Sequence, residues 1–140
     1  MKDIKQIVKE PIFFERNRVY RIYKGGKPYK ELFNDGFDDG TDNMFPEEWI
    51  ASKVKAINPK YFGERDGVSK IKDTDIFFDD LLNDYKDELL GNRKYDCLVK
   101  FLDSAVRLPF QVHPTKEFSR KHFNSDYGKT EAWLVVAKRP

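Results

Sequence analysis

The chain has 140 residues, of which 26 are basic and 24 acidic, so its formal net charge is only +2. This balance excludes the strong positive field that recruits nucleic acid, and no apolar run approaches the roughly twenty residues of a membrane span. A composition of 36% charged and 15% aromatic residues is typical of a folded domain rather than a disordered chain.

Cysteine content and the N-terminus indicate the compartment. Cys97 is the single cysteine, so no internal disulfide can form, which suits a reducing environment. The N-terminal residues lack the continuous apolar core and small-residue cleavage site of a secretory signal. We therefore expect a soluble, cytoplasmic protein with one domain over residues 1–140, and neither nucleic-acid nor membrane partners.

The first half of the chain alternates short strand-like runs with turn-rich loops. Strands are predicted over residues 19–23 and 48–54, which are rich in β-branched and aromatic side chains. Residues that favour turns surround these runs, at positions 25–28, 34–43, 58–59 and 63–69.

Residues 74–90 predict the clearest helix of the chain. Its large apolar side chains recur at helical spacing: Phe77, Phe78, Leu81, Leu82, Tyr85 and Leu89. Thr74 or a neighbouring Asp can cap the start, and Gly91-Asn92 ends the pattern. We interpret the apolar stripe as core packing.

The last third predicts three strands around one short helix. The strands cover residues 98–103, 108–113 and 131–137, and the helix covers residues 114–122 with Thr115 as its cap. A strand as apolar as the last one normally pairs on both sides or lies near a sheet centre. Either an earlier strand pairs with it, or the chain is the front part of a longer protein, and we favour the second interpretation.

Gln111, His113 and Glu131 form a candidate metal site. Gln111 and His113 are two residues apart on a predicted strand, so their side chains share one face while Val112 takes the other. Glu131 begins an apolar strand, where an uncompensated carboxylate would be costly to bury. An amide oxygen, an imidazole nitrogen and a carboxylate are all ligands of divalent metals, and without an obvious fourth ligand the site would be open.

Several segments resemble the class I mannose-6-phosphate isomerases of the cupin superfamily. The specific ones are FLDS at 101–104, LPFQVHP at 108–114 and GKTEAW at 128–133. More loosely, YKGG at 23–26 is similar to the family's Trp-Gly-Gly segment, and EWIAS at 48–52 to its Gly-Glu-Ser-Trp-Glu-x-Ser segment. The resemblance covers the front half of a typical family member.

The resemblance implies a mainly β fold, a cupin-type jelly-roll β-sandwich with a few helices, here incomplete at the C-terminus. It also implies zinc held by Gln, His, Glu and a second His, of which Gln111, His113 and Glu131 match the first three. The second His and the family's catalytic Arg lie in a part of the pattern that this chain does not reach. Lys129 matches a lysine of the substrate pocket.

Three other positions qualify the resemblance. Pro109 stands where the family usually has a Ser that helps hold the substrate phosphate, so an unphosphorylated sugar stays open as the substrate. Tyr23 replaces the family's Trp. Glu48 is a candidate substrate-binding residue that supports the pocket from a neighbouring strand, or else a surface acid.

The resemblance therefore implies a zinc-dependent aldose–ketose isomerase that interconverts mannose 6-phosphate and fructose 6-phosphate. Such a reaction moves a proton between C2 and C1 through an enediolate, whose charge a cation stabilises. Lys129 is the candidate catalytic residue, either as the base or by holding a sugar or phosphate oxygen. A free lysine is protonated at neutral pH, so the first role needs surroundings that favour the neutral amine. The alternative is a cupin module that binds metal or sugar without turnover.

Overall fold

The computed structural model describes residues 4–58 and 63–139. These divide into two compact units, Met1–Val106 (unit 1) and Arg107–Pro140 (unit 2), which are described separately below. The prediction of a single domain over residues 1–140 remains a prediction. Within the described residues, no helix is long and apolar enough to cross a membrane.

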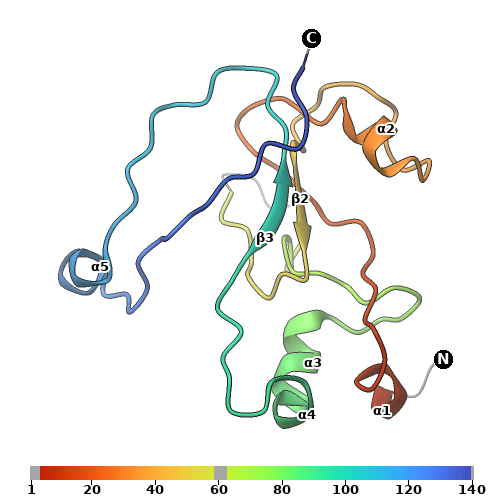
Figure 1. Ribbon diagram of the computed structural model, residues 1–140, viewed down its shortest axis with the longest axis vertical. Coiled ribbons are helices and arrows are strands. Elements are labelled where there is room, and N and C mark those ends of the chain that lie inside the picture. Colours follow the sequence, from red (N-terminus) through yellow and green to blue (C-terminus); the bar gives the residue numbers. More distant parts are fainter. Residues whose placement is uncertain (1–3, 59–62, 140) are drawn as a thin grey trace. The chain divides into compact units, whose positions relative to one another are not determined.

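Unit 1 is built around a three-stranded antiparallel sheet. Its strands are β1 (Arg18–Val19), β2 (Glu47–Ile50) and β3 (Val99–Leu102), in the order β1-β2-β3. Figure 1 shows β2 and β3 side by side, joined through four residue pairs from Glu47↔Leu102 to Ile50↔Val99. The sheet confirms strands at the second and third predicted places in unit 1, whereas the first predicted strand, over residues 19–23, shares only Val19 with β1.

Strand β2 ends earlier than predicted because the backbone turns at Ala51. This residue has φ of 49°, in the left-handed region that a strand cannot contain. Beyond the turn, the hydroxyl of Ser52 donates to the carbonyl of Val54 and accepts from its N–H, so residues 52–54 form a local hydrogen-bonded turn instead of continuing the strand. The predicted strand over residues 48–54 therefore ends at Ile50.

The predicted helix over residues 74–90 forms as two shorter helices, α3 (Phe78–Asp84) and α4 (Lys86–Leu90). It starts late because the Thr74 hydroxyl is used in a local turn, where it accepts from the Ile76 N–H and donates to the Ile71 carbonyl. It breaks at Tyr85, whose φ of −127° and ψ of 36° are not helical. Two further short helices are α1 (Ile4–Ile7) and α2 (Tyr29–Phe33).

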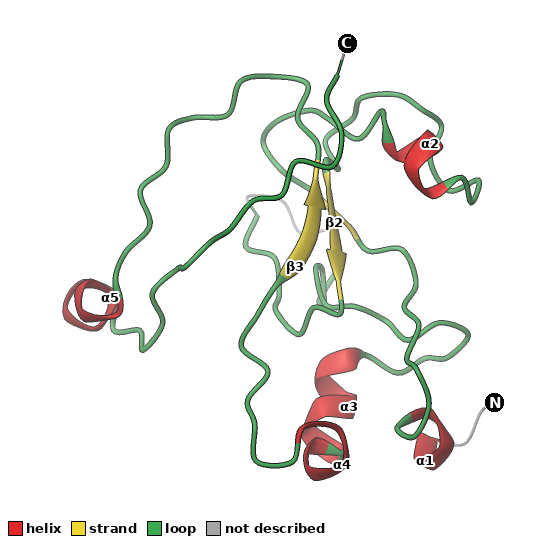
Figure 2. Cartoon of the chain, in the orientation of Figure 1, coloured by secondary structure: helices red, strands yellow, loops and turns green. Residues whose placement is uncertain are grey.

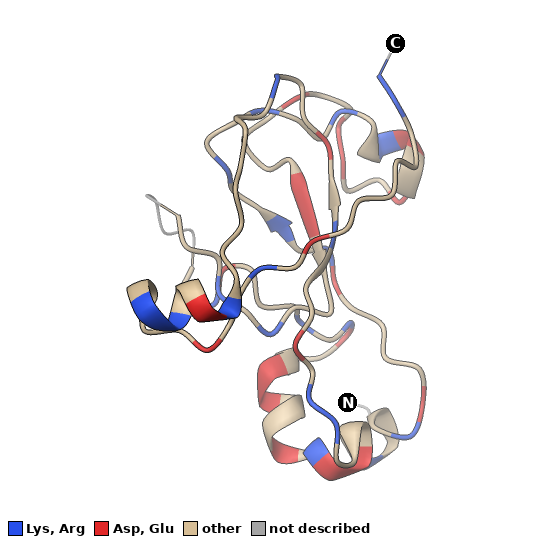
Figure 3. Cartoon of the chain, turned by 60° about the vertical axis from the view of Figure 1, so that its left-hand side comes forward, with Lys and Arg blue, Asp and Glu red and all other residues tan. Residues whose placement is uncertain are grey.

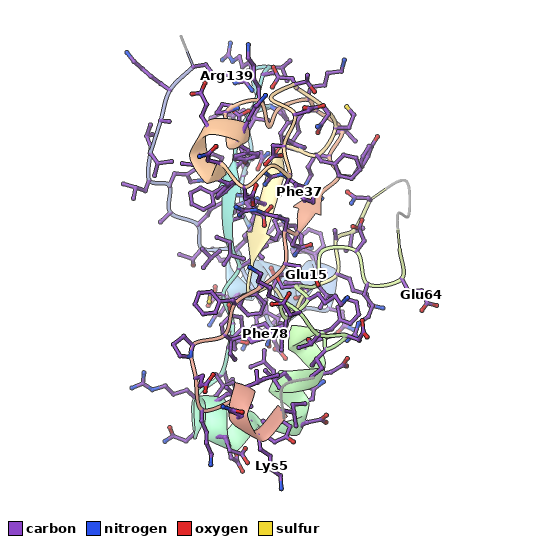
Figure 4. The ribbon with its side chains drawn as sticks, turned by 90° about the vertical axis from the view of Figure 1, so that its right-hand side faces the viewer. Lys5, Glu15, Phe37, Glu64, Phe78 and Arg139 are labelled. Atoms are coloured by element: carbon purple, nitrogen blue, oxygen red, sulfur yellow. The ribbon has the colours of Figure 1, made fainter. Side chains whose placement is uncertain are left out.

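Two apolar clusters hold unit 1 together. The first cluster contains Ile7 of α1, Leu81 of α3 and Ile71, which precedes α3. The second contains Val19, Trp49 and Ala56 and lies around β1 and β2. Figure 4 labels Phe78 among the packed side chains of this unit, where its ring contacts those of Phe14 and Tyr95 edge-on. The predicted role of the stripe on residues 77–89 as core packing is confirmed for Phe78, Leu81 and Leu82, which are buried.

Unit 2 contains one helix, α5 (Lys116–Phe123), among its described residues, flanked by two extended segments (Figure 2). The predicted Thr115 cap is confirmed, since its hydroxyl accepts from the Phe118 N–H at 3.2 Å. At the other end Asn124 takes the left-handed conformation, with φ of 49°, and turns the chain back. The predicted helix over residues 114–122 is therefore confirmed, although it begins two residues later and ends one residue later than predicted.

The predicted strands over residues 108–113 and 131–137 do not form in the described structure. Both segments are extended, but neither has a neighbouring backbone among the described residues to complete a ladder. Their apolar side chains are accordingly exposed: Phe110 by 97%, Val112 by 85% and Leu134 by 86%. The small sheet of unit 1 is the part of the β fold that is observed, and the jelly-roll remains a prediction.

Candidate metal site

The two ends of unit 2 are brought together by the turn that follows α5. The Lys129 N–H donates to the Pro114 carbonyl at 3.1 Å, so the returning segment crosses directly beside the start of the helix. Gly128 makes this approach possible, because a Cβ at this position would lie 2.8 Å from the Pro114 carbonyl oxygen and 2.9 Å from the Lys116 nitrogen. The crossing places Glu131 opposite His113.

His113 and Glu131 are in direct contact. The His113 Nε2–H donates a short hydrogen bond to Oε2 of Glu131, and the two side chains are 26% and 19% exposed. Lys129 adds a charge at the same atom, with its Nζ 3.4 Å from Oε2 of Glu131. The structure thus brings together one imidazole, one carboxylate and one ammonium from residues that the sequence analysis had singled out.

Gln111 belongs to the same hollow. The described residues of unit 2 enclose an open hollow of about 520 Å³, whose lining joins Gln111, His113 and Glu131 to Arg107, Phe110 and Trp133. The three predicted ligands therefore share one concave surface. Gln111 does not contact His113 or Glu131 directly, so the three side chains do not yet form a complete set of metal ligands.

The donor set suits a divalent cation. Imidazole nitrogen and carboxylate oxygen are the commonest zinc ligands after thiolate, and an amide oxygen is a weaker neutral donor. Among residues 4–58 and 63–139 there is no group of three His, Cys, Asp or Glu side chains placed to hold a metal. A site here consequently depends on Gln111 as its third protein ligand.

Glu48, the candidate substrate-binding residue, lies in unit 1 and is buried. Its Oε1 accepts from the Asn17 N–H at 2.9 Å, and its Oε2 pairs with the Arg18 guanidinium at 2.6 Å. Burial raises the pKa of this carboxyl, and the Asn17 hydrogen bond and the Arg18 charge only partly oppose it. The observed contacts join β1 to β2, and a role in substrate binding stays a prediction.

Glu47 is a residue of unit 1 that the sequence analysis missed. Its buried carboxylate accepts hydrogen bonds of 2.7 Å from the Tyr23 hydroxyl and the Trp49 indole N–H. Arg21 and Lys100 bring positive charge to 3.2 and 3.4 Å from Oε2. Figure 3 draws this acidic start of β2 in red. The available signal was the spacing of Glu47 and Trp49, which puts both side chains on one face of a strand.

Arg107 was missed as well, although its spacing offered a clue. In an extended segment, side chains two residues apart share a face, so positions 107, 109, 111 and 113 form one row. The structure confirms that Arg107 lines the hollow together with Gln111 and His113. A basic residue therefore contributes to the surface that carries the candidate metal ligands.

Comparisons with known proteins give partial matches to one class of enzyme. The chain is 35% identical over 75 residues to "Probable mannose-6-phosphate isomerase GmuF" of Bacillus subtilis, a match that covers 50% of this chain and 24% of that protein. It is 41% identical over 49 residues to "Mannose-6-phosphate isomerase ManA" of the same organism, covering 35% of this chain and 15% of the relative.

The chain is similar to parts of two mannose-6-phosphate isomerases. It spans less than a quarter of the length of each curated relative that it matches. No family model matches the chain, and no solved structure matches it either. The comparisons support a relationship to these isomerases, which agrees with the resemblance found in the sequence.

Proposed function

We propose that this chain is part of a cytoplasmic, zinc-dependent aldose–ketose isomerase of the cupin type, which interconverts mannose 6-phosphate and fructose 6-phosphate. The observation that carries the proposal is the contact between His113 and Glu131, eighteen residues apart in the chain, at the wall of the hollow that Gln111 also lines. The two partial relatives named as mannose-6-phosphate isomerases support the choice of reaction.

In this proposal Gln111, His113 and Glu131 hold the cation. His113 Nε2 and Glu131 Oε2 are atoms through which metals bind, and a cation would replace the proton that joins them here. One carboxylate and two neutral ligands leave a net positive charge, which supplies stabilisation for the negative charge of the enediolate when the group is bound.

Lys129 is suited to hold a substrate oxygen. Its side chain is 51% exposed and lies beside the Glu131 carboxylate. A lysine that serves as a general base needs apolar surroundings or a neighbouring cation, and in the proposed site only the cation held by Glu131 meets this need. We therefore propose that Lys129 binds and orients a sugar oxygen from a position beside Glu131, or serves as the base once that cation is bound.

The apolar side of the hollow would orient the sugar. Phe110 and Trp133 line it and are 97% and 63% exposed, so their rings are accessible to a ligand. An aromatic ring can pack against the C–H face of a sugar while the hydroxyl groups remain available to polar side chains. The hollow thus combines an apolar wall with a polar wall, as a carbohydrate site requires.

The test is an isomerisation assay with zinc on the purified chain and on the longest polypeptide that its gene encodes. Interconversion of mannose 6-phosphate and fructose 6-phosphate is expected, with nearly complete loss in His113→Ala and Glu131→Ala. His122→Ala is the matched control, because this second histidine is exposed on α5 away from the proposed ligands. Activity that survives the His113 and Glu131 substitutions would overturn the proposal.

A binding module without turnover is the second candidate. It is favoured by the pairing of His113 and Glu131 without a third His, Cys, Asp or Glu among the described residues. A chain that retains zinc or sugar, yet leaves mannose 6-phosphate unchanged even as the longest encoded polypeptide, would favour this module over the isomerase.

A further inference from the structure

Arg107 is the one lysine or arginine among the described residues that line the hollow in unit 2. Gln111 lies four positions further along the chain, so in an extended segment both side chains belong to the same row. The carboxylate of that lining, Glu131, already contacts His113 and Lys129. The surface around Arg107 therefore carries a positive charge that the acidic side chain of the hollow does not neutralise.

The guanidinium of Arg107 is accessible to a ligand. The residue is exposed, and among the described residues it forms no ion pair with a carboxylate. Other arginines of the chain are paired in this way, including Arg16, Arg18, Arg21, Arg65 and Arg120. A basic side chain that lines a hollow without an acidic partner is a candidate for binding an anionic group.

The position of Pro109, two residues after Arg107, indicates which kind of group the guanidinium would bind. The proline ring lines the same hollow and offers no hydroxyl or N–H to a ligand. Arginine presents five N–H donors in a planar fork that matches two oxygens of a phosphate. A guanidinium two residues away in the same row can therefore supply the donors that Pro109 lacks.

We infer that Arg107 binds the phosphate group of the sugar substrate and so selects phosphorylated over neutral sugars. The inference rests on the proposed function, because it names a specificity residue of the same hollow. It adds Arg107 to the predicted site, with Phe110 and Trp133 facing the sugar and Arg107 holding its charged end. The phosphate is thereby held by charge and hydrogen bonding rather than by a hydroxyl.

Ligand binding without metal provides the test. Mannose 6-phosphate and mannose are titrated into the metal-free chain, and affinities are measured by calorimetry while the arginine side-chain N–H signals are followed by NMR. The wild-type chain is expected to bind mannose 6-phosphate at least about tenfold more tightly than mannose, with a shift in one arginine signal. Charge-assisted hydrogen bonds of roughly 1.5–3 kcal/mol correspond to about 10–100-fold in affinity.

Two substitutions isolate the guanidinium. Arg107→Gln should remove most of the preference and the shifting signal, while leaving the affinity for mannose unchanged. Arg107→Lys should keep part of the preference that Arg107→Gln loses, because lysine retains the positive charge but cannot form the bidentate hydrogen bonds of a guanidinium. Arg93→Gln is the control, since Arg93 is an exposed arginine of unit 1 outside the hollow.

The outcomes separate this inference from the proposed function. If Arg107→Gln keeps the wild-type preference, or the wild-type chain shows none, Arg107 has no such role, whether or not the protein is an isomerase. If the preference depends on Arg107 but the longest encoded polypeptide never isomerises the sugar, the inference stands and the proposed reaction fails.

Discussion

Glu47 shows how a single buried carboxylate can be kept ionised. Burial by itself would raise its pKa, but hydrogen bonds from Trp49 and Tyr23 and the charges of Lys100 and Arg21 outweigh that effect and hold the pKa below its usual 4.5. A carboxyl with a lowered pKa stabilises the folded state fully above its unfolded pKa, and this contribution is lost as the pH falls through the folded value.

Glu47→Gln should therefore destabilise unit 1 and flatten its acid dependence. The substitution leaves Arg21 and Lys100 without their shared carboxylate, and breaking such a buried pair costs about 3 kcal/mol. Urea unfolding at pH 7 should show this loss. Between pH 5 and 3, the wild-type free energy of unfolding should fall more steeply than that of the variant.

Glu48, the neighbouring carboxylate, supplies a control in which the pH dependence of the free energy of unfolding should change in the opposite direction. The pKa of Glu48 is raised by burial, so its contribution is present at low pH and is lost as the pH rises through the folded value. Glu48→Gln should consequently make the free energy of unfolding rise more steeply with pH than in the wild type. Equal slopes for the wild type and both variants would contradict this account of the pair.

At the scale of elements, features that depend on neighbouring residues, such as the cap of α5, were predicted well. Strand pairings between residues far apart in the chain were not. The start of helix α5 follows from Thr115, which was predicted as its cap from the adjacent residues. Strand β2 was found but overextended, because the left-handed turn at Ala51 has no signature in an alanine. The extended segments 108–113 and 131–137 were assigned as strands from composition, which cannot say whether a partner backbone is present.

In the candidate site too, the residue types were predicted from the sequence but their arrangement in space was not. Gln111, His113 and Glu131 were singled out from their residue types, from the two-residue spacing of Gln111 and His113, and from the resemblance to the isomerase family, and the structure places all three on one hollow. Their convergence could not be read from the sequence, since it depends on how the turn after α5 returns the chain. Arg107 was missed because a lone arginine is most often a solvated surface residue.

Gly128 provides a test of that return. Gly128→Ala would place a methyl group against backbone atoms of residues 114–116, which cannot move aside as a flexible side chain can. The segment carrying Glu131 should shift away from His113, so zinc affinity should fall by about tenfold or more, as with lost supporting contacts in other metal sites.

Gly63→Ala is the matched control for this prediction, because nothing lies within 4 Å of a Cβ at that position. Zinc competition against a fluorescent chelator would measure both variants, and circular dichroism would show whether α5 remains folded. Unchanged zinc affinity in Gly128→Ala would mean that the crossing does not position the site.

At the scale of the whole molecule, the observed sheet and the proposed jelly-roll differ in extent. The structure shows three antiparallel strands in unit 1, and the matched stretches make up no more than 24% of either relative. Sheet folds are built from pairings between residues far apart in the chain. A jelly-roll therefore cannot be derived from the strand-forming composition of these residues, and it enters through the resemblance alone.

The proposed function requires Gln111, His113 and Glu131 to act as ligands of one cation. The most direct measurement is the zinc content of the purified chain, determined by mass spectrometry for the wild type and for single alanine variants of these residues, with His122→Ala as control. Stoichiometric zinc in the wild type and the control, with little or none in His113→Ala and Glu131→Ala and less in Gln111→Ala, is the predicted result. Zinc content that is the same in every variant would contradict it.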